Sequence, residues 1–161
     1  MLMSSVLSFL DWCSHTDTIV FIRESSFGMP ALQSVHLVGL TVWLAAILVL
    51  NLRLAAVTMM DWSLPAIERQ LRPWALGALT LMMASGAIMF LGNPQKYLAN
   101  PAFLFKMAAL CLAMVCQLVV LRRFFRSDPA LRARSLNIAV AALSLTLWFS
   151  VGWAGRVIAF V

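Results

Sequence analysis

Charged residues are scarce in this 161-residue sequence: Asp, Glu, Lys and Arg make up 11% of it, and hydrophobic residues 63%. An ordinary soluble domain has about 25% charged and roughly 45–50% apolar residues. Three long runs, 27–52, 73–95 and 135–155, contain no charged residue at all. Each run is near the roughly 20 residues that cross a bilayer. The composition therefore excludes a water-soluble globule.

Paired cysteines and the motifs of soluble enzymes are also lacking. The three cysteines include no CxxC pair that would hold zinc, form a redox disulfide or attach haem covalently, and we expect all three to be small apolar residues. The sequence has no P-loop, GxGxxG or HExxH motif and no paired acidic residues within its hydrophobic runs. Phosphoryl transfer, nicotinamide binding and zinc hydrolysis therefore have no support, and any chemistry depends on the few polar groups in the membrane.

Four hydrophobic segments are present, and they predict an all-α integral membrane four-helix bundle. Proline marks the expected starts of the first three spanning helices, at Pro30, Pro73 and Pro101, because the first turn of a helix does not need its N–H. The connections are too short to form a soluble core, so residues 1–161 are expected to form a single transmembrane domain. The predicted spans cover about 30–52, 73–92, 101–124 and 133–160.

The segments outside the spans are expected to lie at the membrane surface. Residues 1–28 are predicted to form an N-terminal interfacial segment with an amphipathic helix over 2–13, and a short apolar stretch after it could cap the bundle. Between the first two spans, Asp61 to Pro65 has the pattern of a helix start and predicts a short interfacial helix before Pro73.

The positive charges predict the orientation of the chain, whose net charge is +6. Arg23, Lys96 and Arg156 fall on one side, and by the positive-inside rule both termini face the periplasm of a bacterial inner membrane. The excess of basic residues is therefore explained by the orientation of the chain in the lipid bilayer, and nucleic-acid binding is not needed to explain it. Eight arginines fall in the two connections on the opposite side: Arg53, Arg69, Arg72, Arg122, Arg123, Arg126, Arg132 and Arg134.

His36 is the first candidate for chemistry. It follows Pro30 by six residues, which places it roughly 9 Å inside the first helix. An ionisable residue at this depth usually faces the bundle interior and marks a functional site. Imidazole is a common metal ligand and haem axial ligand. A proton-carrying or substrate-binding group and a structural hydrogen bond between helices are the alternatives.

Lys106 and Arg156 are expected at the same depth as His36, each from a different helix. They could neutralise haem propionates or a substrate carboxylate, although Lys106 could instead reach lipid headgroups and Arg156 could be an ordinary interfacial anchor. Near them on the fourth helix, small residues allow a neighbouring helix or a flat cofactor to approach closely. The residues expected to shape this slot are Trp148, Gly152 and Gly155, and the candidates for a sixth haem ligand are Met29 and Met89.

Two further polar residues have simpler interpretations. Arg53 closes the inner end of the first helix, where we expect it to pair with Asp61 or Glu68 or to touch phosphate headgroups, in a structural role. His15 is expected to face solvent rather than to be a second ligand.

Several motifs resemble a family of uncharacterised bacterial four-helix membrane proteins over nearly the whole chain. That family commonly has Asp at the position of Asn51 and Gly at the position of Ala55. A histidine in the first helix and a lysine in the third are more distantly similar to haem-containing membrane protoporphyrinogen oxidases, and the topology is similar to that of copper-resistance D proteins. These similarities imply a haem ligand at His36 and a functional lysine at Lys106. The motifs are Ser34-Val35-His36-Leu37-Val38-Gly39-Leu40, Asn51-Leu52-Arg53-Leu54, Ser85-Gly86-Ala87-Ile88-Met89-Phe90, Tyr97, Phe103-Leu104-Phe105-Lys106 and Gly155-Arg156-Val157-Ile158-Ala159.

The sequence thus favours a haem b-binding inner-membrane protein that transfers electrons, alone or as a subunit of a membrane redox complex. One alternative is a cofactor-free structural or accessory subunit of a larger membrane complex. Another is a transporter of metal ions or small anions, although no predicted span has a proline near its middle, as a broken transporter helix would.

Overall fold

The structure is a computed structural model that describes residues 2–126 and 129–158, and every element in these ranges is a helix. Four helical segments are long and apolar enough to cross a membrane, which confirms the predicted all-α four-helix bundle of a multi-pass membrane protein. Three segments are single helices: α3 (Gly28–Leu54), α4 (Leu64–Gly92) and α8 (Arg134–Val157). The remaining segment joins α6 (Pro101–Val115), a π-helix (Cys116–Leu121) and α7 (Arg122–Phe125).

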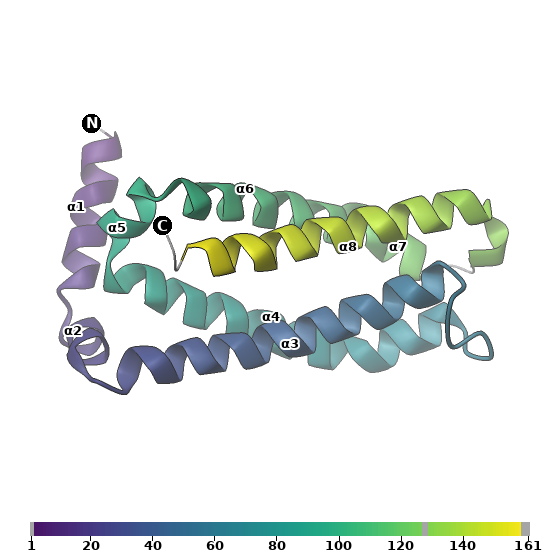
Figure 1. The fold of residues 1–161 in the computed structure, drawn as a ribbon, viewed down its shortest axis with the longest axis horizontal. Coiled ribbons are helices and arrows are strands. Elements are labelled where there is room, and N and C mark those ends of the chain that lie inside the picture. Colours follow the sequence, from purple (N-terminus) through teal and green to yellow (C-terminus); the bar gives the residue numbers. More distant parts are fainter. Residues whose placement is uncertain (1, 127–128, 159–161) are drawn as a thin grey trace.

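The spans form two helix pairs, α3 with α4 and α6 with α8, and contacts between α3 and α8 join the pairs. Both ends of the described chain lie at one end of the bundle, which we call the His36 end (Figure 1). The opposite end, called the Arg53 end, holds the loop of residues 55–63 between α3 and α4 (Figure 1). Large apolar side chains cover the outer faces, as contact with a lipid bilayer requires: Leu37, Phe105, Leu118, Phe149 and Trp153 are each more than half exposed.

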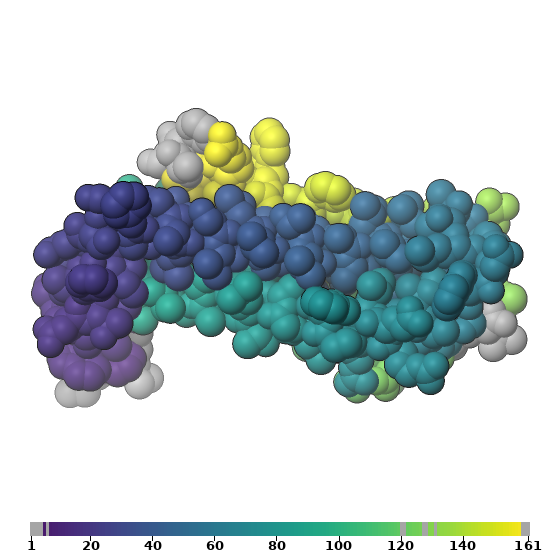
Figure 2. Space-filling model, turned by 90° about the horizontal axis from the view of Figure 1, so that it is seen from below, coloured from purple at the N-terminus to yellow at the C-terminus, as the bar shows by residue number. Residues whose placement is uncertain are grey.

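Two short helices at the N-terminus lie at the His36 end, α1 (Leu2–Ser14) and α2 (Asp17–Glu24). Figure 1 shows α1 across the direction of the spans, and Figure 2 shows the N-terminal segment covering this end of the molecule. Phe9 and Trp12 of α1 are more than half exposed, which suits insertion into a membrane surface. The helix predicted over 2–13 is confirmed, and its position at the membrane surface stays a prediction.

The second span begins earlier than predicted. Helix α4 starts at Leu64, with Pro65 in its first turn, and continues through Pro73 without interruption. The prediction that a helix starts at Pro73 is wrong, because the turns before it bury Leu64 and Ile67 in a hydrophobic cluster. That burial outweighs the hydrogen bond that an internal proline removes.

The other predicted boundaries agree more closely. Helix α5 (Pro94–Ala99) precedes α6, and the Asn100 side chain caps α6 by accepting hydrogen bonds from the N–H groups of Ala102 and Phe103. The π-helix that follows α6 has no counterpart in the prediction. The predicted end of the fourth span, at residue 160, lies outside the described residues, and a single 3-10 turn at Pro129–Leu131 precedes α8.

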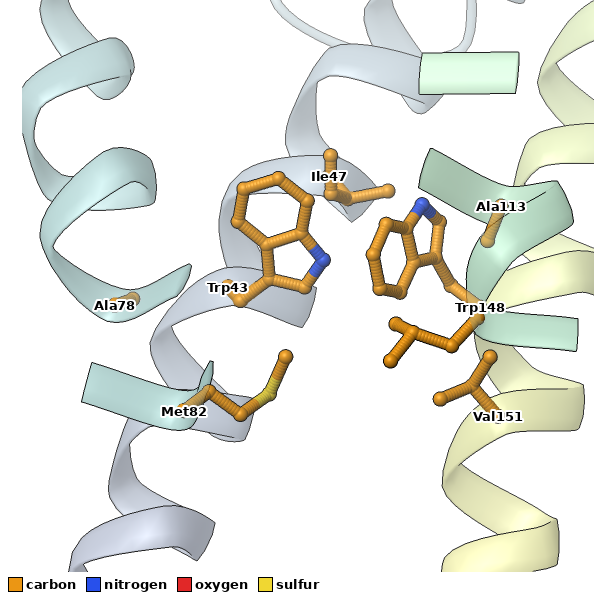
Figure 3. Close-up of a cluster of buried hydrophobic side chains, with 8 residues drawn as sticks. Trp43, Ile47, Ala78, Met82, Ala113, Trp148 and Val151 are labelled. Atoms are coloured by element: carbon orange, nitrogen blue, oxygen red, sulfur yellow. The ribbon is translucent and has the colours of Figure 1, made fainter. Parts of the chain in front are cut away.

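Two tryptophans form the centre of the main hydrophobic cluster (Figure 3). Trp43 of α3 and Trp148 of α8 are 4% and 1% exposed, and their rings meet edge to face at 4.9 Å between centroids. The Trp43 indole nitrogen lies on the side of the ring that faces Trp148 (Figure 3). Both indole nitrogens are buried and have no hydrogen-bond partner among the described residues. Met82 of α4 and Ala113 of α6 complete this layer, so all four spans meet here.

A polar contact joins α3 and α8 nearer the Arg53 end. The Asn51 side chain is completely buried, and its Nδ2 donates to the backbone carbonyl of Ile47 and to the Ser144 hydroxyl at 3.1 Å. An interhelical hydrogen bond of this kind stabilises a membrane bundle by about 0.6 kcal/mol on average. It also fixes the register of α3 against α8.

Close packing of α3 against α4 requires a glycine at position 39. A Cβ atom there would lie 3.1 Å from the Ala78 carbonyl oxygen and 3.3 Å from the Met82 nitrogen, both of which are backbone atoms. These atoms cannot move aside without moving the helix. Gly77 of α4, in contrast, has no atom within 4 Å of such a Cβ.

We therefore expect Gly39→Leu to separate α3 from α4 and to lower the free energy of unfolding by about 1–3 kcal/mol. Thermal unfolding in detergent, followed by circular dichroism, measures the change. The matched control is Gly77→Leu, which should leave the unfolding temperature nearly unchanged. Equal effects of the two substitutions would contradict the packing described here.

Candidate functional site

His36 of α3 is bound to α4 by a side-chain hydrogen bond. Its Nδ1 lies 2.9 Å from Ser85 Oγ, and the Ser85 hydroxyl donates to the carbonyl of Leu81 at 2.7 Å. Because the single hydroxyl hydrogen of Ser85 is used in that way, its oxygen accepts from His36 and Nδ1 carries a proton. The lone pair of the neutral imidazole is then on Nε2.

A glycine makes room for the His36 ring against α4. A Cβ on Gly86 would lie 3.2 Å from His36 Cε1, so the imidazole rests on the helix backbone at this point. The close approach of the two helices at Gly39 allows this contact. His36 is half-buried as a result, with one ring edge held by Ser85.

Lys106 of α6 lies against α8 in a similar way. A Cβ on Gly155 would lie 3.4 Å from Lys106 Nζ, and Lys106, like His36, is half-buried. His36 and Lys106 thus both lie at the His36 end of the bundle, His36 against α4 and Lys106 against α8.

The other predicted site residues do not pack against His36 or Lys106 as Gly86 and Gly155 do. Trp148 is buried in the tryptophan layer, deeper in the bundle than Gly155. A Cβ on Gly152 would meet no atom within 4 Å, so no neighbouring helix packs closely there. Arg156 is exposed at the surface of α8.

The two candidate methionines lie at the His36 end of α3 and α4. Met29 packs against Gly92, where a Cβ would lie 3.9 Å from its sulfur. Met89 is half-buried and follows Ser85 by four residues, which places it one turn further along the same face of α4. Among the described residues no group of three or more His, Cys, Asp or Glu side chains could hold a metal ion.

His15 and Arg53 lie away from this site. His15 is exposed, as expected, with Nδ1 2.7 Å from the carbonyl oxygen of Asp11. Arg53 Nε donates to the carbonyl of Trp62 at 2.9 Å. Of the two alternatives expected for Arg53, no ion pair with Asp61 or Glu68 forms among the described residues, and contact with phosphate headgroups stays a prediction.

Ser85 is the residue of the site that sequence reasoning missed. It occurs in the motif that begins Ser85-Gly86. A serine in a spanning helix usually donates a hydrogen bond to a backbone carbonyl of the preceding turn, and Ser85 does so as well. The pairing of a small polar residue with glycine, at the depth of His36 on the neighbouring helix, is the signal that could have identified it.

The fold defines a class: a multi-pass membrane protein built as an all-helical four-helix bundle. The chain belongs to a family of unknown function, DUF6644, whose model matches residues 5–161. No curated protein and no solved structure matches the chain significantly.

The hydrogen bond to Ser85 predicts one tautomer of the neutral His36 ring. Nitrogen-15 NMR of histidine-labelled protein should show a protonated Nδ1 and an unprotonated Nε2, and Ser85→Ala should increase the population of the other tautomer. His15→Gln assigns the signals and should leave those of His36 unchanged. A neutral His36 with its proton on Nε2 in the wild-type protein would contradict the assignment.

Proposed function

We propose that this protein binds haem b at the His36 end of the bundle and transfers electrons in a bacterial inner membrane. The observation that carries the proposal is the His36–Ser85 hydrogen bond. Histidines that bind metals almost always donate their other ring N–H to an acceptor, which fixes the ring and increases the basicity of the ligating nitrogen. In this role His36 would hold the haem iron through Nε2.

The second ligand, if the iron has one from this chain, is a methionine. Met89 lies one turn from Ser85 on the same face of α4, and Met29 packs against Gly92. A thioether ligand would raise the reduction potential of haem iron. Bound haem supplies one-electron redox chemistry, and the protein supplies its orientation and electrostatics.

The polar side chains at the His36 end suit an anionic cofactor. Gly86 and Gly155 let His36 and Lys106 lie against the backbones of α4 and α8, and the Lys106 ammonium can neutralise a propionate. Arg156 would interact with the second propionate, and Gly152 and Trp148 would line the α8 side of the haem site. The distant similarity to haem-containing protoporphyrinogen oxidases supports the ligand role of His36, and we do not extend their reaction to this chain.

The partner of this electron transfer is a membrane redox protein or the larger complex to which the chain contributes. The positive-inside distribution supports a periplasmic location for the His36 end and for both termini. A cofactor-free structural subunit and a metal or small-anion transporter are the competing functions, and both predict a protein that does not bind haem.

Purified protein, as isolated or after addition of haem, should show a Soret band and a reduced-minus-oxidised α band. His36→Ala should abolish both bands, because the axial ligand is lost. The matched control is His15→Ala, which removes the chain's other histidine and should leave the spectrum unchanged. A wild-type protein that stays colourless after haem addition would refute the proposal, as would equal loss in both variants.

Lys106 should also influence the reduction potential. A nearby positive charge favours the ferrous state, which carries one positive charge less, so Lys106→Met should lower the midpoint potential in a redox titration. Lys96→Met changes an exposed lysine of α5 and serves as the control. Equal midpoint potentials in wild type and Lys106→Met would show that Lys106 does not face the haem.

A further inference from the structure

A second polar site lies at the opposite end of the bundle, around Arg53. A pocket of about 340 Å³ opens there between the end of α3, the loop of residues 55–63 and Pro129. Its volume is within the range of ligand sites, about 300–1,000 Å³. The pocket is far along α3 from His36, so it is independent of the proposed haem site.

Arg53 is held rigidly at this pocket. Its side chain is 9% exposed, and Nε is fixed by the hydrogen bond to the Trp62 carbonyl. The two terminal nitrogens of its guanidinium have no hydrogen-bond or ion-pair partner among the described residues. When Nε of a buried arginine is held in this way, its two terminal nitrogens can donate parallel hydrogen bonds to two oxygens of a phosphate.

Asp61 lines the same pocket and is exposed. It forms no ion pair with Arg53, although both residues are described by the structure. The pocket therefore presents one cation and one anion at separate points. A free phosphate would be attracted by Arg53 but repelled by Asp61. A ligand with both a phosphate and an ammonium group would be attracted by both residues.

The remaining walls and the position of the pocket favour a lipid. Met60 and Pro65 add apolar surface beside the two charges. Helix α3 has 27 residues and is therefore about 40 Å long, so its end reaches the headgroup layer of a bilayer. The exposed Trp62 is also typical of this layer.

We propose that the Arg53 pocket binds the head group of a zwitterionic aminophospholipid such as phosphatidylethanolamine. The Arg53 guanidinium binds the phosphate, and the Asp61 carboxylate accepts hydrogen bonds from the ammonium group. The apolar walls contact the glycerol backbone and the beginning of an acyl chain. The site then anchors the loop of residues 55–63 to the lipid layer.

Native mass spectrometry of the full chain in detergent, with palmitoyl-oleoyl phosphatidylethanolamine or phosphatidylglycerol added, tests this assignment. The wild type should retain one phosphatidylethanolamine and bind phosphatidylglycerol several-fold more weakly, because the latter has no ammonium group. Arg53→Gln should reduce phosphatidylethanolamine binding by about ten-fold, the effect of losing a charge-assisted hydrogen bond. Arg69→Gln, which changes an exposed arginine nearby, is the control and should bind like the wild type.

Asp61→Asn keeps the proposal testable if Arg53→Gln does not fold, because Asp61 is exposed. It should abolish the preference for phosphatidylethanolamine over phosphatidylglycerol. Equal binding of the two lipids by the wild type, or an unchanged preference in Asp61→Asn, would overturn the assignment. Displacement of bound lipid by millimolar inorganic phosphate would instead identify a free-phosphate site and would also overturn it.

Discussion

The edge-to-face contact between Trp43 and Trp148 joins the two helix pairs of this protein, and the position of its polar groups depends on that contact. The two rings are 4.9 Å apart and almost completely buried, with Met82 and Ala113 completing the layer. Aromatic pairs of this kind add roughly 0.5–1.5 kcal/mol beyond the burial of their area. On one side of this layer lies the Asn51–Ser144 hydrogen bond, and on the other lie His36 and Lys106.

Polar groups on the two sides of the tryptophan layer differ in their burial. Asn51 is completely buried; its Nδ2 donates to the Ile47 carbonyl and the Ser144 hydroxyl, while its Oδ1 has no hydrogen-bond partner among the described residues. His36 is only half-buried and contacts Ser85 through Nδ1. The greater exposure of a titratable ring near one end of the bundle is the physical reason for proposing a ligand at the His36 end.

Composition was sufficient to predict the four spans, because a bilayer requires long apolar helices whatever their packing. It did not predict that α4 passes through Pro73, since that depends on the burial of Leu64 and Ile67 against other helices. Depth along each helix placed His36 and Lys106 at one level, but rotation about the helix axes decides which side chains meet. Ser85 and Gly86 could not be assigned to His36 for this reason, and Gly152 meets no neighbouring helix in the structure.

Nitrogen-15 NMR of histidine-labelled protein, titrated with diamagnetic zinc protoporphyrin IX, tests the central claim most directly. The account predicts that the Nε2 signal of His36 shifts on binding, while Nδ1 remains protonated through its bond to Ser85. Signals of His15 should not move. Binding of the porphyrin with no change at His36 Nε2 would contradict the account.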